Sequence, residues 1–233
     1  MNEVAIEALV AAPRDAVYRA WTDPDMMSGW LCEEAQGSAE PGGHLDLAWP
    51  SLGQKLRLDV TEADGLGTLE LSATIGNTRQ VQKLRFESRG ESGEQTHIVL
   101  RHRAPANVVR GITSGWRLRL FVLEHFLRWG GKRELEVVAG TALGTEQAVF
   151  DRLSESARLH IGEPTLHLEP DGLCGRVTDG VIYVIRRFSL SPPSHLLAAQ
   201  LMTWQDDDLK ALRPTMSSLV EQAATPSPSP HLH

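Results

Sequence analysis

The chain has 233 residues, a formal net charge of −7, 41% hydrophobic residues and 23% charged residues. This length supplies a buried core for one large domain or two small ones. No apolar stretch approaches the ~18 residues that cross a bilayer, and the acidic first residues do not resemble a secretory signal. The two cysteines form no local motif, which suits a reducing compartment. We therefore expect a globular cytoplasmic protein without membrane insertion.

Positive charge is concentrated in the middle of the chain. Residues 76–133 carry 12 Lys/Arg against 4 Asp/Glu. The basic residues are interleaved with apolar ones and form neither a block nor a nucleic-acid motif. We expect them on solvated strand faces, paired with the acidic flanks, and we expect no nucleic-acid partner.

The first 30 residues predict a strand followed by two short helices. Apolar residues alternate with polar or small ones over residues 3–10, which is typical of a strand. Pro13 and Asp15 favour the first turn of a helix. Asp23 can cap a second helix, which carries Trp30.

The next hundred residues predict an antiparallel sheet followed by one long helix. Between residues 45 and 100, apolar residues recur at every second position in runs separated by glycine-containing turns. After Pro105 the apolar spacing changes to three or four residues, which predicts a helix over roughly 107–129. Gly130 and Gly131 are suited to end that helix.

The second half of the chain resembles a shortened copy of the first. Residues 134–155 repeat the strand, turn and helix expected for residues 3–23. Strands are expected over 165–169, 174–178 and 181–190, whereas 195–204 fit a helix or a strand. A closing helix should run to residue 222, with Asp206–Asp208 capping its start rather than binding a cation. The predicted domains are therefore 1–132, a degenerate lobe at 133–224, and a disordered tail at 225–233.

A family resemblance lies in residues 3–130. It rests on APRDAVYRAWTDP at 12–24, on Trp30, on PGG at 41–43 and on GW at 115–116. These residues are similar to one branch of the START-like (SRPBCC, helix-grip) superfamily, related to the C-terminal domain of the activator of the ninety-kilodalton heat-shock protein ATPase. The resemblance implies an α+β fold in which a curved antiparallel sheet packs on a long C-terminal helix. The appended lobe is expected to be of similar type.

The resemblance also implies a cleft between the sheet and the long helix. In families of this type the cleft holds small apolar or amphipathic ligands. We therefore expect non-enzymatic binding of a small hydrophobic or aromatic molecule, for sensing, carriage or sequestration. A co-chaperone that stimulates a heat-shock ATPase is the alternative, and a polyketide cyclase-like enzyme is a further one. A homodimer is left open.

The candidate cleft residues are aromatic and aliphatic, because ligand sites are mostly apolar with a few polar anchors. They are Trp30, Trp49, Leu58, Leu71, Phe86, His97, Trp116 and Leu120. His97, His102 and Arg103 are candidate polar anchors, and a cyclase would rely on His97, His102 or Tyr18 as acid or base. No nucleophile elbow, dinucleotide fingerprint or metal-ligand spacing is present. We expect no catalytic residue, no metal and no cofactor.

Overall fold

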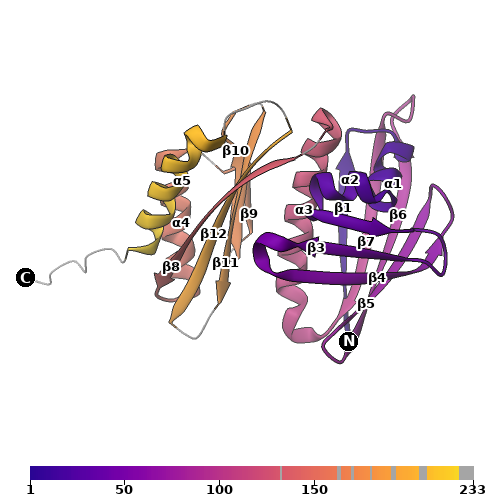
Figure 1. Ribbon diagram of the computed structural model, residues 1–233, viewed down its shortest axis with the longest axis horizontal. Helices are drawn as coiled ribbons and strands as arrows, with labels where there is room; N and C mark the ends of the chain where they lie inside the picture. Colours follow the sequence, from indigo (N-terminus) through magenta and orange to yellow (C-terminus); the bar gives the residue numbers. More distant parts are fainter. Residues whose placement is uncertain are drawn as a thin grey trace, which may run out of the picture. The chain divides into compact units, whose positions relative to one another are not determined.

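The computed structural model describes residues 1–131, 133–161, 164–168, 171–178, 180–189, 193–204 and 209–225. The chain divides into two compact units, Met1–Lys132 (unit 1) and Arg133–His233 (unit 2) (Figure 1). Asp206–Asp208 and residues 226–233, where helix capping and a disordered tail were expected, lie outside the described residues. No helix within the described ranges is long and apolar enough to cross a membrane.

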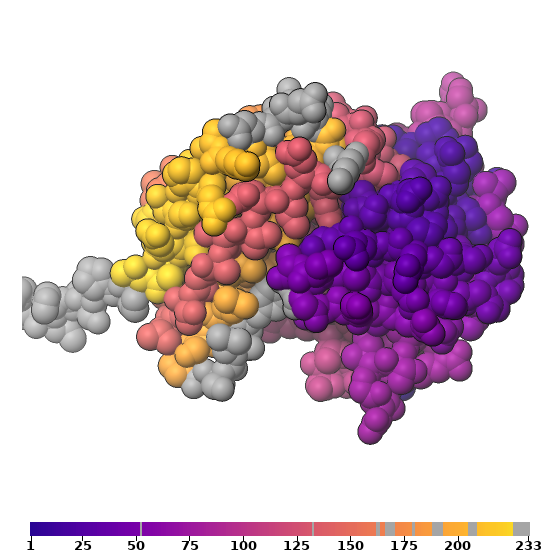
Figure 2. Space-filling view, viewed as in Figure 1, coloured from indigo at the N-terminus to yellow at the C-terminus, as the bar shows by residue number. Residues whose placement is uncertain are grey.

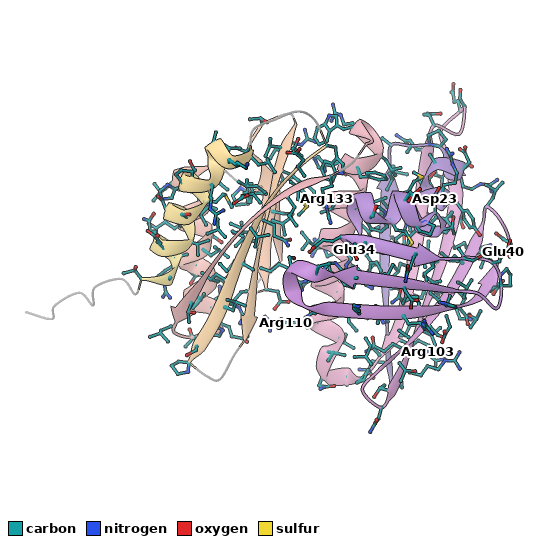
Figure 3. All side chains as sticks on the ribbon, viewed as in Figure 1. Asp23, Glu34, Glu40, Arg103, Arg110 and Arg133 are labelled. Atoms are coloured by element: carbon teal, nitrogen blue, oxygen red, sulfur yellow. The ribbon has the colours of Figure 1, made fainter. Side chains whose placement is uncertain are left out.

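Unit 1 begins with β1 (Asn2–Val10), α1 (Arg14–Thr22) and α2 (Pro24–Trp30). The turn between the helices forms at Asp23 (Figure 3). Its carboxylate accepts hydrogen bonds from the backbone N–H groups of Asp25 at 2.9 Å and Met26 at 3.3 Å. Pro24 occupies the first turn of α2, where its missing N–H is not needed. The start of α2 therefore forms as the sequence predicts, whereas α1 begins at Arg14, with Asp15 in its first turn and Pro13 at the N-cap position just before it.

Unit 1 continues as one antiparallel meander. Its strands are β2 (Glu34–Gly37), β3 (His44–Trp49), β4 (Gln54–Ala63), β5 (Thr68–Ile75), β6 (Thr78–Arg89) and β7 (Gln95–Ala104). With β1 they form a seven-stranded sheet in the order β1-β7-β6-β5-β4-β3-β2. The pairing register between β4 and β5 shifts between Val60 and Glu62, and a bulge of this kind bends a strand.

The long helix α3 (Val109–Trp129) closes unit 1 and packs against β1, α1 and α2. It follows a short 3-10 turn at Ala106–Val108 and ends at Gly130, whose φ of 67° suits glycine. The predicted fold class, a curved antiparallel sheet with one long helix, is confirmed. Side chains at alternate positions of each strand point between the sheet and the helices, and they form the core of the unit.

Gly29 marks the closest approach of α2 to α3. A Cβ atom at this position would clash with the ring of Phe126, whose side chain is buried. We expect Gly29→Ala to destabilise unit 1 by about 1–3 kcal/mol, because the clash outweighs the better helix propensity of alanine. The matched control is Gly111→Ala in α3, where nothing lies within 4 Å of a new Cβ. It should gain up to ~1 kcal/mol. Urea melts compare the two variants, and equal effects would contradict the close approach.

Unit 2 contains β8 (Glu134–Leu143), α4 (Glu146–His160), β9 (Leu166–Leu168), β10 (Gly172–Arg176), β11 (Val181–Ser189), β12 (Ser194–Thr203) and α5 (Leu209–Ala224). Its sheet order is β8-β12-β11-β10-β9. In both units the first strand pairs with the last strand, and the remaining strands follow as a meander. Helices α4 and α5 pack on one face of this sheet. The ambiguous stretch 195–204 lies in strand β12 as far as Thr203.

Candidate functional site

One part of the unit 1 interior is an aromatic cluster around Trp21. Its ring centroid lies 4.8 Å from that of Trp30, 5.4 Å from that of Trp116 and 6.4 Å from that of Phe86. All four side chains are buried. They come from α1, α2, α3 and β6, so the cluster joins four elements that are distant in the sequence. Figure 2 draws the outer surface of unit 1, coloured from indigo to magenta in chain order.

A chain of buried hydrogen bonds leads from this cluster to the sheet. Nε1 of Trp116 donates to Nδ1 of His102 at 2.8 Å, and Nε2 of His102 lies 2.9 Å from Oε1 of Gln80. Because Nδ1 accepts, the ring proton is on Nε2 and is donated to Gln80. The three side chains are 4%, 5% and 8% exposed. Polar groups from α3, β7 and β6 are therefore linked inside an apolar interior.

Burial keeps the His102 ring neutral. Desolvation, together with a smaller effect of the positive charge of Arg119, lowers the pKa of His102 to about 4. The neutral ring can accept from Trp116 and donate to Gln80 at the same time. Both ring nitrogens are therefore occupied, and His102 can transfer a proton only if this chain breaks.

The lowered pKa predicts a pH-dependent stability of unit 1. As pH falls below the ordinary histidine value of 6.5, the unfolded chain binds a proton while the folded chain does not until about pH 4. Stability is therefore complete at pH 7 and falls by roughly 2 kcal/mol between pH 6.5 and 4. His102→Asn should remove this part of the pH dependence in urea melts. His97→Asn on the same strand is the matched control, and an equal change in both variants would contradict the assignment.

Three buried polar atoms of unit 1 have no hydrogen-bond partner among the described residues. One of them is Nδ1 of His97. The other two are Nε1 of Trp21 and Oε1 of Gln82, in side chains that are 0% and 7% exposed. In the sheet, Gln82 lies between Leu71 of β5 and His102 of β7. An unsatisfied buried polar group costs about 1–3 kcal/mol. Such groups are rare in folded proteins and call for an explanation.

The structure brings most of the predicted site residues into this interior. Leu58, Leu71 and Leu120 are buried, as are Trp30, Phe86 and Trp116. Trp49 is half-buried at the end of β3, where its Nε1 donates to the carbonyl of Leu31 at 3.2 Å. These side chains pack on one another and together form the core of unit 1.

His97 lies on the opposite face of the sheet from His102, contrary to the sequence prediction. Its Nε2 lies 3.1 Å from Glu7 and its Nδ1 lies 3.7 Å from Glu87, both on the outer face. Arg103 is also exposed on that face (Figure 3). The reason is the two-residue period of a strand, which separates odd from even positions of β7. Of the three predicted anchors, His102 alone points inward.

Sequence reasoning missed three residues of this site, namely Trp21, Gln80 and Gln82. The signal for the glutamines was present, because Leu84 and Phe86 fix the inward face of β6 and the same period includes positions 80 and 82. The position of Trp21 on the apolar side of α1 was also recognisable. Its central place in the cluster depends on α2 and α3, which local spacing does not reveal.

Unit 2 has a surface groove of its own. It has a volume of about 600 Å³ and lies between β8 and the C-terminal half of α5. The residues that line it are small and mostly uncharged, with Glu221 as the one carboxylate among them.

The part of the chain that the structure describes has no group of three His, Cys, Asp or Glu side chains arranged to hold a metal ion.

Comparison with known proteins identifies relatives of unit 1. Residues 11–119 match the family described as "Activator of Hsp90 ATPase homolog 1-like protein". No curated protein matches the sequence. Among solved structures, DynU16 from the dynemicin biosynthetic locus is 15% identical, with 96% of both chains covered and a TM-score of 0.50. At this identity the likeness is one of fold alone.

Two further solved structures resemble the first half of the chain. CalU16 from Micromonospora echinospora is 24% identical over 54% of this chain and 75% of its own, with a TM-score of 0.47. The Aha1 dimer from Colwellia psychrerythraea is 16% identical over 56% of this chain and 98% of its own, with a TM-score of 0.49.

Proposed function

We propose that unit 1, whose residues 11–119 match the family described as "Activator of Hsp90 ATPase homolog 1-like protein", is a binding module. It binds a small hydrophobic or aromatic molecule between its sheet and α3, without converting it chemically. Sensing, carriage and sequestration are all roles that such binding would serve.

The observation that supports this proposal is the polar content of the unit 1 interior. A core that served stability alone would gain nothing from the polar atoms of Gln82 and Trp21, which are buried and unpaired. Ligand sites, in contrast, are apolar surfaces with a few polar groups that orient the bound molecule. A ligand that pairs with these atoms would recover the free energy that the unliganded protein loses there.

The aromatic cluster would supply the apolar part of the site. Trp21 and Trp30 are held by α1 and α2, and Nε1 of Trp30 is fixed by the carbonyl of Ala20 at 2.8 Å. Trp116 comes from α3 and is tied to the sheet through His102. A ligand that enters beneath α3 would replace contacts of Trp116, while the rings on α1, α2 and β6 remain in place as its binding surface.

The state of the titratable groups favours binding over catalysis. Both nitrogens of His102 are engaged within the protein. The Tyr18 hydroxyl accepts a hydrogen bond from the backbone N–H of Gly65 at 3.1 Å, and burial raises its pKa. A general acid or base must reach the reacting proton, and both of these groups are engaged in hydrogen bonds within the protein. The cyclase alternative therefore gains no specific support.

The co-chaperone alternative gains no specific support from the basic part of the chain either. Cations of this segment lie on the outer face of the sheet beside carboxylates: Lys83 with Glu70, Arg89 with Glu87, and Arg101 with Glu3. Paired and solvated charges of this kind are common on exposed strands and do not by themselves form a binding surface.

The shared strand order supports a second structural proposal. We propose that residues 133–224 are a shortened and degenerate copy of unit 1, because β8-β12-β11-β10-β9 repeats the arrangement β1-β7-β6-β5-β4. Nuclear Overhauser contacts between the facing backbones of β8 and β12, such as those of Val138 and Ala199, should be observed along the length of the two strands. A β8 that pairs elsewhere would remove the proposal.

Intrinsic tryptophan fluorescence of the full chain tests the binding function. Ethylbenzene, 4-ethylphenol and decanoic acid are titrated in turn, with excitation at a wavelength that tryptophan alone absorbs strongly. At least one probe should cause a saturable change with a Kd below about 1 mM, which corresponds to about −4 kcal/mol. The control is Leu9→Ser, which removes an exposed apolar side chain of β1. Absence of saturation, or its loss in Leu9→Ser, would contradict binding in the interior.

A further inference from the structure

We infer that the molecule bound in unit 1 is a neutral aromatic or alicyclic compound with a hydroxyl group, and that Gln82 selects it by accepting the hydroxyl hydrogen. This inference rests on the proposed function and specifies its ligand class. It makes Gln82 the specificity-determining residue of the site.

The position of Gln82 gives it access to the interior. Burial alternates along β6, and Gln82 shares its inward face with Leu84 and Phe86. Phe86 belongs to the cluster around Trp21, while His102, directly across from Gln82 on β7, is bonded to Trp116. Gln82 therefore lies on the same inner face of the sheet as the aromatic cluster and the polar chain.

The neighbours of Gln82 cannot satisfy its amide oxygen. Leu71, across from it on β5, is apolar. His102, across from it on β7, uses its only N–H for Gln80, and its other nitrogen already accepts from Trp116. An amide oxygen needs a donor, and these two flanking side chains have none left to give. The missing partner is a group that carries an O–H or N–H hydrogen.

The unpaired N–H of Trp21 favours a ligand that can also accept a hydrogen bond. This Nε1–H is a buried donor without an acceptor, so this interior holds one unpaired donor and one unpaired acceptor. A hydroxyl group both donates and accepts, and it is small enough for an apolar site. An ether or a ketone would only accept, and it would leave the oxygen of Gln82 unpaired.

The surroundings argue for a neutral ligand. The buried polar side chains of unit 1 are Ser72, Gln80, Gln82, Thr96, His102, Ser114 and His125. None of them carries a fixed charge, and His102 is neutral at pH 7. The guanidinium of Arg119 stacks over the Trp116 ring, 5.2 Å from its centroid. A carboxylate or ammonium group beside Gln82 would lose its hydration without gaining a counter-charge in contact with it.

Isothermal titration calorimetry of the full chain with three matched probes tests this inference. The probes are 4-ethylphenol, 4-ethylanisole, in which a methyl group replaces the hydroxyl hydrogen, and ethylbenzene, which lacks the oxygen. We expect 4-ethylphenol to bind at least 10-fold more tightly than either of the others, because sites built around a hydrogen bond reject analogues that cannot make it. Gln82→Met should abolish this preference, so that 4-ethylphenol binds no more tightly than ethylbenzene. Gln36→Met, at an exposed glutamine of β2, should behave like the parent protein.

The outcomes separate this inference from the proposed function. If all three probes bind equally, or if the preference survives in Gln82→Met, the inference is wrong while ligand binding stands. If no probe binds at all, the proposed function fails and the inference fails with it. A thermal melt adds a readout without ligand: Gln82→Met should keep or raise the Tm, because it removes an unpaired buried amide. A lowered Tm would show that Gln82 is already satisfied within the protein and would overturn the inference.

Discussion

Trp116→Ala is expected to lower the unfolding free energy of unit 1 by about 3–5 kcal/mol. The Trp116 ring is 4% exposed and lies 5.4 Å from the ring of Trp21. Its removal leaves a cavity and also leaves Nδ1 of His102 without the donor that now satisfies it. This loss is a large share of the ~5–15 kcal/mol that holds a typical domain together.

Urea denaturation with Trp116→Phe as the matched variant separates the two contributions to this loss. Phenylalanine retains a ring in the cluster but cannot donate to His102, so we expect a loss of roughly 1–2 kcal/mol. A loss below ~1 kcal/mol for Trp116→Ala would mean that the ring is not packed as described. An unchanged affinity for 4-ethylphenol in Trp116→Phe would make this residue purely structural.

The double variant Asp171→Asn/Glu146→Gln is expected to cost unit 2 about 3–5 kcal/mol, because it leaves a buried guanidinium without its carboxylates. The side chain of Arg187 is 3% exposed, and its Nη2 lies 3.3 Å from Glu146 and 3.5 Å from Asp171. Nη1 of Arg187 lies 2.9 Å from Nδ1 of His195. Glu146 and Asp171 therefore both lie close enough to Arg187 to compensate its charge.

Adding Arg187→Met to this double variant should recover part of the lost stability, because an apolar side chain needs no counter-charge. The control is Arg213→Met, which breaks an exposed ion pair with Glu136 and should cost at most ~1 kcal/mol. Urea denaturation, followed by a spectroscopic signal from unit 2, measures the unfolding free energy of the double variant, the triple variant and Arg213→Met. A triple variant that is less stable than the double variant would show that Arg187 stabilises unit 2 by packing rather than by its charge.

The elements of unit 1 could be predicted because their signals are local. Asp23 and Pro24 specify the start of α2 through their own side chains, whatever lies around them. The alternation of apolar and polar residues in β6 and β7 specifies which side chains face inward. His97 was predicted on the wrong face of β7, although the two-residue alternation set by Ile98 and Leu100 places it on the outer face. The same alternation in β6, counted from Leu84, places Gln82 in the interior.

The remaining features depend on contacts between distant residues. Local propensity could not settle residues 195–204, where Ala198 and Ala199 favour a helix, because β11 and β8 on either side impose a strand. The unpaired state of Gln82 was likewise beyond sequence reasoning. It arises because His102 is saturated by Gln80 from β6 and by Trp116 from α3.

The central claim, that a small molecule binds inside unit 1 beside Trp21 and Gln82, is tested most directly by the indole N–H signals in a two-dimensional ¹H–¹⁵N spectrum. The chain has six tryptophans, and Trp21→Phe and Trp116→Phe variants assign the two signals of interest. On titration with 4-ethylphenol, we expect the Trp21 signal to move downfield with saturation as its free Nε1–H gains an acceptor. The Trp116 signal should move with it, while that of Trp204 in unit 2 stays in place. If neither the Trp21 nor the Trp116 signal moves at saturating 4-ethylphenol, the interior of unit 1 is not the binding site.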